Sequence, residues 1–538
     1  MPDKEATQMA AGRCAYTAAS GERCPRDQWH DEFCFWHATV PDKEVTSETN
    51  PPEELVEGAN LRNATITGDT LAGTTLKAPD LTNATVTNAD LSGATLTTAS
   101  LDGLTVTKSD LSEIHLINGK GTDIDIADTT LHGAKLEDTT ITDGEIQDTS
   151  LAQATFSSVE FANIELVDGS LRRSQMAETT LYRVETIDTE LTEADLSGCS
   201  LVDCNFSSCD FSATDLADTE VTYCDFTSSG LGGIVLSDAT IELSTFSEAK
   251  LSQARLTGAT IRESDFDGAL LDRASAAEAT FEECRAQDVQ ARSIDLSNTS
   301  IIDSRASGGI FTDAICTETN FEGSDLSGAD FRGAELVGPR LGGTDLADIR
   351  LDRSTTLHAI HRYAGSEADE GRNEAIYQEL YAAAQRNGLS RLAREFRTRR
   401  QHARRRDAFR RIIIKNNKPS ERLQSVFDWT SLALAAAVAG YGEQPARVVT
   451  SSMLTILLFA PLYLLIGDLA WAGEPPAGAS GSTEAVQALV FSLASFTGMN
   501  AGVISTTVAG RLLASLESFL GLGFIVLFVF VLTRRMTD

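Results

Sequence analysis

The chain has 538 residues, too many for a single hydrophobic core, so we expect several structural units. Its formal net charge is −34. The negative charge is concentrated in residues 61–351, which carry about −32, whereas residues 352–538 carry about +5. Nine cysteines in a chain of this length exclude a short, disulfide-stapled secreted protein. The first eleven residues are polar, so we expect no signal peptide and a reducing, cytoplasmic environment.

The acidic surplus has two interpretations. Asp and Glu number 78, against 44 Lys and Arg. Acidic surfaces of this kind keep proteins soluble in concentrated salt, as in salt-loving archaea, and an ordinary acidic protein is the alternative. In both cases the middle of the chain forms a polyanionic surface.

Residues 1–40 contain four side chains of the kind that bind metals. They are Cys14, Cys24, Cys34 and His37, spaced as Cys-x9-Cys-x9-Cys-x2-His. Three thiolates and one imidazole make a complete tetrahedral zinc set, and the closing Cys-x2-His resembles a zinc knuckle. A module this small has little core of its own, so we expect zinc to be structural and to supply folding energy. The alternatives are His30 as a substitute ligand, or three free cysteines in a disordered tail.

A five-residue repeat occupies residues 59–355, after residues 41–58, which are rich in Pro, Glu, Thr and Ser and are interpreted as a linker. Stepping by five from Leu61 to Leu351, 52 of 59 positions are Leu, Ile, Val, Phe or Met. Two residues before each lies a second, smaller class such as Ala64. A period of five fits neither a helix nor a flat strand, so it requires a coil with one inward bulky residue per side.

This pattern resembles the pentapeptide-repeat family, A-(D/N)-L-x-x. The repeats Ala89-Asp90-Leu91-Ser92-Gly93 and Ala329-Asp330-Phe331-Arg332-Gly333 carry the resemblance. It implies an all-β, right-handed quadrilateral β-helix solenoid with four repeats, about 20 residues, per coil, hence about 14–15 coils. Each bulky side chain is then expected to pack on the one twenty residues later, as Leu61 on Leu81.

We expect no catalytic role for this rod. His115 and His132 are isolated and are interpreted as surface histidines, whereas Cys204 and Cys224 are interpreted as small buried hydrophobic residues. The charge of the rod suits solvation in salt or binding to a basic partner, an unidentified cytoplasmic protein. Some members of the family mimic DNA and bind topoisomerases, so a DNA mimic remains an alternative.

Residues 356–430 are interpreted as a basic helical neck. The pattern predicts one helix ending near Asn387-Gly388 and a second starting at Ser390. Thirteen Lys or Arg lie from Arg391 to Arg422. Because hydrophobic segments follow, we interpret this basic run as facing a membrane surface rather than a nucleic acid.

Residues 431–538 are interpreted as a membrane domain. Two apolar segments, about 448–471 and 512–532, are long enough to span a bilayer. No Lys or Arg lies between Arg447 and Arg511, whereas both flanks are basic, so we predict a multi-pass protein of the cell membrane with both termini cytoplasmic. A third apolar segment, about 485–497, is too short to cross and is predicted to be a re-entrant pore helix. Leu432–Ala439 is also too short and is expected near the interface.

This arrangement resembles the two-helix pore-loop domain of the potassium-channel-like family. Residues 491–497 resemble its pore helix, Gly510-Arg511 resembles the start of its inner helix, and Gly521 and Gly523 are interpreted as hinge points. Potassium filters read T-V-G-Y-G. The corresponding candidates are Thr497, Gly498, Met499, Asn500, Ala501 and Gly502, so potassium selectivity is not supported. Glu517 and Asp468 are interpreted as intramembrane carboxylates with a functional role, or as residues exposed at the interface.

Together these features predict a membrane protein with a cytoplasmic rod and a channel-like domain that lacks a potassium-type filter. A channel requires a homo-tetramer, because one pore loop supplies a quarter of a filter. The alternatives are a membrane-anchored scaffold and a DNA mimic that binds a topoisomerase. We expect no enzyme, because no nucleophile–base set or phosphate-binding glycine loop occurs.

Overall fold

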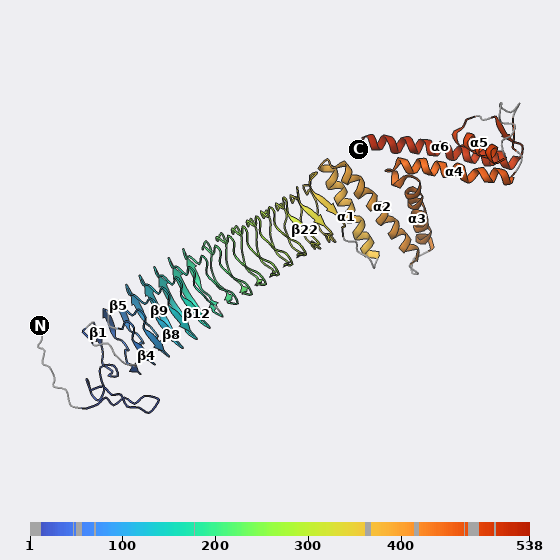
Figure 1. Cartoon of the computed structure of the whole chain (residues 1–538). Coiled ribbons are helices and arrows are strands. Elements are labelled where there is room, and N and C mark those ends of the chain that lie inside the picture. The colour runs from blue at the N-terminus through green and yellow to red at the C-terminus, as the bar shows by residue number, and fades with distance from the viewer. Residues whose placement is uncertain are drawn as a thin grey trace. The chain divides into compact units, whose positions relative to one another are not determined.

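A computed structural model describes residues 12–46, 48–49, 56–68, 71–176, 178–360, 367–413, 419–466, 469–471, 484–499 and 502–537 (Figure 1). The chain forms two compact units, Met1–His361 and Arg362–Asp538. The first unit is a β-solenoid of about 15 turns with an N-terminal module, and the second is helical.

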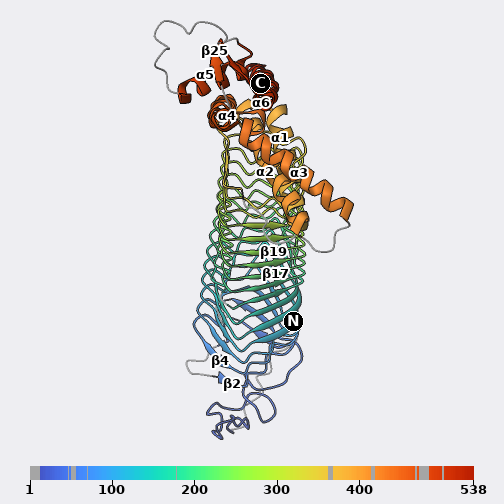
Figure 2. The same cartoon turned by 90° about the vertical axis from the view of Figure 1, so that its right-hand side faces the viewer.

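Parallel strands stack along the sides of the solenoid (Figure 2). The largest sheet contains β1 (Glu44–Val45), β3 (Thr65–Gly68), β5 (Thr85–Ala89), β7 (Thr105–Thr107), β9 (Lys120–Ala127), β11 (Thr140–Gln147), β13 (Glu160–Val167), β14 (Thr180–Tyr182), β15 (Glu185–Ile187), β16 (Ser200–Val202), β17 (Glu220–Thr222), β18 (Thr240–Glu242), β19 (Thr260–Arg262), β20 (Thr280–Glu282) and β21 (Ser300–Ile302). A second sheet contains β2 (Val56–Glu57), β4 (Thr75–Lys77), β6 (Thr95–Thr97), β8 (His115–Ile117), β10 (Lys135–Glu137) and β12 (Thr155–Ser157), and a third contains β22 (Ile315–Thr317), β23 (Glu335–Val337) and β24 (Thr356–His358).

Each coil has four sides and about 20 residues. Ile66 pairs with Val86, and Val86 with Val106, on one side, whereas the β4–β6 ladder forms another. The remaining two sides are held by isolated parallel bridges, such as Asn60 to Asp80 and Asp90 to Asp110. The predicted 20-residue step is therefore confirmed.

The solenoid interior is a set of columns of bulky side chains. Leu61 and Ile66 are fully buried. On one column Phe206, Phe226, Phe246 and Phe266 stack with ring centroids 5.2, 4.8 and 4.9 Å apart. These separations match the spacing of neighbouring β-strands, so each ring packs directly on the ring of the next coil.

From Asn63 to Asp348, the corners of the coil use a left-handed backbone conformation. The N–H of Ala64 donates to the Leu61 carbonyl at 3.0 Å and closes a turn around Asn63, whose φ is 53°. The same conformation recurs every five residues, mostly at Gly, Asn and Asp but also at Leu243. Gly, Asn and Asp are the residues that adopt positive φ at least cost, which explains their enrichment in the repeat.

Both ends of the solenoid extend beyond the predicted boundaries. The interpretation of residues 41–58 as a linker is wrong in part, because β1 pairs with β3 and β2 pairs with β4. At the other end β24 pairs with β23 through Glu335 and Thr356, a step of 21 residues. The extra residue brings Leu357 into the buried position, so the rod continues past residue 355 into the predicted neck.

The helices of the second unit are α1 (Glu367–Arg386), α2 (Ser390–Ile413), α3 (Pro419–Ala439), α4 (Pro445–Ile466), α5 (Glu484–Thr497) and α6 (Val508–Thr537), with a short 3-10 helix η1 (Gly440–Gly442) before α4. Helices α1 and α2 pack together, and α4, α5 and α6 contact one another. The predicted end of the first helix near Asn387, the start of the second at Ser390 and the short third apolar helix agree with α1, α2 and α5.

Two predicted boundaries in this unit are wrong. The segment Leu432–Ala439 is not an isolated short piece but the end of α3, which crosses the predicted domain boundary at residue 430. The first apolar helix begins at Pro445 and ends at Ile466. The end of the predicted span, Leu469–Trp471, forms β25, which pairs antiparallel with β26 (Val503–Ser505) and is therefore extended rather than helical.

Candidate functional sites

The N-terminal module folds its cysteines together with two turns. Cys14 and Cys24 lie on facing segments, because the Cys14 N–H donates to the Arg26 carbonyl and the Cys24 N–H donates to the Tyr16 carbonyl. Gly21, with a φ of 87°, lies in the turn between them. Cys34 and His37 are joined by a second turn, in which the His37 N–H donates to the Cys34 carbonyl at 3.1 Å. Local backbone geometry therefore presents all four side chains to one point.

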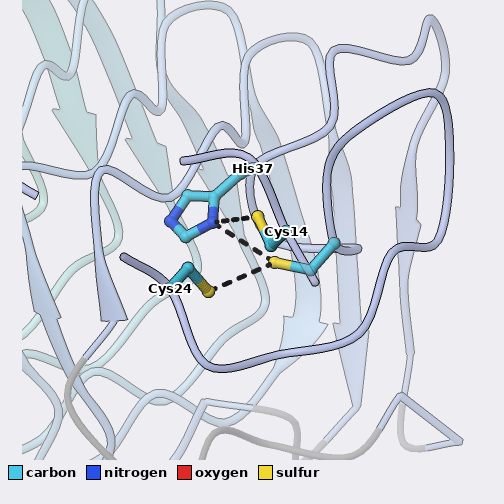
Figure 3. A group of neighbouring side chains, drawn as sticks. Cys14, Cys24 and His37 are labelled. Carbon is cyan, nitrogen blue, oxygen red and sulfur yellow. Dashed lines mark hydrogen bonds between the residues drawn. The ribbon is translucent and has the colours of Figure 1, made fainter. Parts of the chain in front are cut away.

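The four predicted ligands form a closed, buried cluster (Figure 3). Their ligand atoms all lie within 4.8 Å of one another. His37 Nδ1 is 3.3 Å from Cys14 Sγ and 3.2 Å from Cys34 Sγ, and Cys24 Sγ is 4.0 Å from Cys34 Sγ. Ligands around a tetrahedral zinc ion lie about 3.5–3.8 Å apart, given Zn–S and Zn–N bonds of about 2.3 and 2.0 Å. The residues present fit this ion.

The surroundings orient the imidazole of His37. Its Nε2 is 2.7 Å from the Glu57 carbonyl, so Nε2–H donates there and Nδ1 is left as the ligand atom. Tyr16 stacks on the ring with centroids 3.9 Å apart. Burial lowers the pKa of His37 and raises the pKa of the Cys34 thiol to about 12. The alternative ligand His30 is half exposed, pairs with Asp31 at 3.1 Å and lies outside the cluster.

The singled-out residues of the rod have ordinary structural roles. His115 pairs with Glu137 at 3.0 Å on the outer surface, and His132 is exposed. The cysteines are buried and free. The thiols of Cys204 and Cys224 donate to carbonyls of the preceding coil, at 3.3 and 3.4 Å. Burial raises the pKa of Cys199 to about 11, which makes it a poor nucleophile.

Glu517 is the centre of a buried polar network in the helical unit. This carboxylate is fully buried and accepts hydrogen bonds from the Tyr463 hydroxyl at 2.7 Å and the Ser492 hydroxyl at 2.5 Å. Ser492 Oγ also lies 2.9 Å from the Ile456 carbonyl of α4. One side chain of α6 is therefore joined to both α4 and α5.

The segment after α5 does not resemble a potassium filter in its composition. Thr497 ends α5, and its hydroxyl donates to the Leu493 carbonyl at 2.7 Å. Gly498 and Gly502 both have a φ of 70°, and the side chain of Met499 is 73% exposed. Three further candidates, Asp468, Asn500 and Ala501, lie outside the described residues.

Gly521, interpreted from the sequence as a hinge point, lies in close contact with the end of α5. A Cβ at this position would lie 1.8 Å from the Phe496 carbonyl oxygen at the end of α5, so only glycine permits this contact. The neighbouring Ser518 hydroxyl donates to the Ser495 carbonyl at 2.6 Å. By contrast, a Cβ at Gly523 meets nothing within 4 Å.

Comparison with protein families identifies the repeat. The model described as "Pentapeptide repeat region" matches residues 199–276, and the model "Pentapeptide repeats (8 copies)" matches residues 80–116 and 314–353. These three segments of the chain contain pentapeptide repeats. No curated protein matches the sequence.

Solved structures of similar fold match part of the chain. The chain is similar to HetL, a pentapeptide-repeat protein involved in heterocyst differentiation regulation in Nostoc sp. strain PCC 7120. The identity is 19%, the match covers 45% of this chain and 87% of HetL, and the TM-score is 0.17. The chain is also similar to QnrB1, a plasmid-mediated fluoroquinolone resistance protein, with 13% identity, coverages of 44% and 93%, and a TM-score of 0.19. Neither likeness bears on function.

Three residues of the chain were not anticipated from its sequence. Lys43 lies in the predicted linker but is buried, and its ammonium donates to the carbonyls of Phe35 at 3.0 Å, Ala38 at 2.8 Å and Asn60 at 2.5 Å. Burial lowers its pKa to about 8. Tyr463 and Ser492 resemble ordinary interruptions of apolar helices. The sequence does not show the hydrogen-bond partners of a lone lysine in an acidic segment or of one hydroxyl group in an apolar helix. Without these partners, the role of either residue is hard to predict.

Proposed function

We propose that this pentapeptide-repeat protein is a multi-pass protein of the cell membrane, anchored by α4 and α6 with both termini in the cytoplasm. Both Pro445–Ile466 and Val508–Thr533 are long and apolar enough to cross a bilayer. Large apolar side chains on both helices are more than half exposed, among them Met453, Leu458 and Phe519. Arginines flank the pair of helices and are missing from the loop that joins them.

The membrane unit acts as an ion channel without a potassium-type filter, assembled as a homo-tetramer. The observation that carries this proposal is the attachment of the short helix α5 to both long helices through Glu517, Tyr463 and Ser492. A helix of 14 residues, about 21 Å long, is too short to cross a bilayer core of about 30 Å. Polar contacts that hold it between two spans support a re-entrant pore helix.

The experiment that tests conduction compares two glycines of α6. Purified full-length protein is reconstituted in liposomes, and ion flux is measured for the wild type, Gly521→Ala and Gly523→Ala. We expect flux in the wild type and in Gly523→Ala, and its loss in Gly521→Ala, because the added methyl group displaces α5 from α6. Asn500→Ala and Glu517→Gln extend the test to the filter segment and the buried carboxylate.

A membrane-anchored scaffold is the second candidate function. It is favoured by the segment from Thr497 to Gly502, which lacks the glycine pattern of a conducting filter and exposes Met499. On this alternative the rod binds a cytoplasmic protein and the helices are an anchor. The absence of flux in wild-type liposomes under varied salt, voltage and pH, together with a monomer in membrane cross-linking, supports the scaffold and contradicts the channel.

The N-terminal module holds one structural zinc ion through Cys14, Cys24, Cys34 and His37. The closed donor cluster and the orienting contact of His37 with Glu57 support this assignment. Four protein ligands leave no open coordination position on the ion. The ion therefore stabilises the module and does not take part in a reaction. The rod that follows is right-handed, as expected for the family.

Metal analysis of the purified full-length protein tests this assignment. We expect about one zinc per chain in the wild type, and its loss in Cys34→Ser, because three ligands bind zinc far more weakly than four. Cys284→Ser is the matched control, since Cys284 is a buried cysteine of the rod. Equal zinc content in the two variants, or none in the wild type, contradicts the assignment.

A further inference from the structure

The α1–α2 hairpin contains an open, basic pocket of about 360 Å³. Its lining residues are Asn373 and Tyr377 of α1 and Arg399, His402, Ala403, Arg405 and Arg406 of α2. Asn373 and Tyr377 are four residues apart in α1. In α2, Arg399, His402 and Arg406 are separated by three and then four residues. The lining residues of each helix therefore lie on one face of that helix. The floor is the buried Ala403, whose small side chain leaves room between the longer ones.

The carboxylates around the pocket are already paired with other arginines. Glu374 pairs with Arg400 and Arg404, each at 3.4 Å, and Asp407 pairs with Arg411. Within the pocket itself, Arg399 is neutralised by Glu395 at 2.6 Å. Among the residues that the structure describes, no carboxylate forms an ion pair with Arg405 or Arg406. The pocket therefore retains two positive charges.

The pocket is joined to the segment that precedes the first apolar helix. His402 Nδ1 lies 3.3 Å from the Tyr441 hydroxyl, and the two rings meet edge to face with centroids 4.9 Å apart. Tyr441 belongs to η1 and has a φ of 58°. The next residue but one, Glu443, forms a largely buried ion pair with Arg397 at 2.9 Å. These contacts place the basic pocket beside the start of α4, on the side of the helical unit that bears the arginines.

We propose that this pocket binds a phosphate group through Arg405 and Arg406, with Tyr377 and His402 as additional polar contacts. Two guanidinium groups without carboxylate partners match the charge and fork geometry of a phosphate dianion or diester. The group is supplied either by the headgroup of an anionic membrane lipid or by a soluble polyphosphate. Its binding stabilises the contact between His402 and Tyr441, and hence the position of η1 before α4. The site is independent of ion conduction.

Two titrations of the purified full-length protein in detergent separate the two sources. One uses inorganic tripolyphosphate, and the other uses short-chain phosphatidylglycerol with phosphatidylcholine of the same chain length as reference. The test variant is Arg405→Gln with Arg406→Gln. The matched control is Arg391→Gln with Arg394→Gln, which removes the same charge from the same helix outside the pocket. Circular dichroism checks that both variants retain their helices.

We expect the test variant to bind at least about 10-fold more weakly than the wild type, and the control to bind within about 2-fold, because only the first pair contacts the phosphate. Tyr377→Phe keeps every charge and removes one hydroxyl group, so its affinity for the phosphate should fall by a smaller factor. Binding of phosphatidylglycerol alone identifies a lipid headgroup, and binding of tripolyphosphate alone identifies a soluble ligand. No binding of either probe, or an equal loss in the test and control variants, overturns the proposal. Liposome flux is measured separately, so failure of this site and failure of the channel are distinguishable.

Discussion

The interiors of the rod and of the helical unit are held together in different ways. In the rod, bulky side chains of successive coils pack on one another, as Phe246 does between Phe226 and Phe266. In the helical unit, Glu517 accepts hydrogen bonds from Tyr463 and Ser492, which lie 54 and 25 positions earlier in the sequence. The rod repeats one contact many times, whereas the helical unit depends on a few contacts that occur once.

This difference determines how far a local change spreads. A solenoid is stabilised by nearest-neighbour contacts, so a lesion in one coil affects that coil and its neighbours. A network that joins three helices transmits a single change to all of them. The following predictions test this comparison, beginning with the largest effect.

Phe246→Ala is expected to destabilise its own coil by about 4 kcal/mol, because it removes a ring stacked on both faces and leaves a cavity. The measurement is amide hydrogen exchange along the rod. Protection should fall in residues 220–270 and stay unchanged in the first coils. Leu243→Ala is the control, since that side chain lies in the same coil but is 40% exposed. A uniform loss of protection along the whole rod contradicts the nearest-neighbour description.

Glu517→Leu is expected to destabilise the helical unit by about 3 kcal/mol, because the Tyr463 and Ser492 hydroxyls lose their buried acceptor. Thermal unfolding in detergent and hydrogen exchange in α5 measure this loss. Glu517→Gln keeps an acceptor of similar shape and should cost about 1 kcal/mol. If α5 keeps its protection in Glu517→Leu, the network does not hold the helix in place.

Lys43→Met is expected to destabilise the N-terminal end of the rod by about 2 kcal/mol, because three carbonyl groups lose their donor. Faster exchange of the Thr65 amide, which donates to the Lys43 carbonyl at 2.8 Å, is the readout. Lys108→Met changes an exposed lysine of the rod and should have no effect. An equal result in both variants shows that the buried lysine has no special role.

Acid should loosen the C-terminal coil through Asp352, the smallest of these effects. Hydrogen bonds from Ser354 first, and then from Gly333 and Thr355, lower the pKa of Asp352 to about 2. Because the folded pKa lies below the unfolded value of about 3.9, its contribution is present above pH 4 and is lost as the pH falls toward 2. Limited proteolysis at residues 330–360 should rise across this window in the wild type. Asp352→Asn should show no such rise in proteolysis. A rise of equal size in the wild type and in Asp352→Asn would mean that other carboxylates cause it.

Much of the rod could be predicted because its information is local and repeated. At 52 of the 59 positions that follow every five residues from Leu61 to Leu351, a bulky residue specifies an inward side chain regardless of what surrounds it. The step of twenty residues then follows from four sides per coil. The corner conformation was not predicted, because Gly, Asn and Asp at the turn position are mixed with residues such as Leu243 that rarely adopt a positive φ.

The candidate sites were predicted to different extents. The spacing of Cys14, Cys24, Cys34 and His37 identified a cluster that the fold brings together, because close cysteines and one histidine leave few other groupings. The sequence did not indicate that this module continues into the first coil through Lys43, β1 and the Glu57 carbonyl. In the helical unit the sequence singled out Glu517 but neither of its hydrogen-bond partners.

The sequence by itself determined the repeat, the acidic surface, the four residues of the Cys and His cluster and the two apolar helices, since each depends on residue type and spacing along the chain. Only the tertiary structure decided that β1 and β2 pair with the first coils of the rod, that Gly521 lies against the end of α5, and that Arg405 and Arg406 are left without carboxylate partners among the described residues. These features depend on which side chains meet across long separations. Which charges are paired and which side chains are buried is decided only when the chain has folded. The spacing of residues along the sequence therefore does not reveal these features.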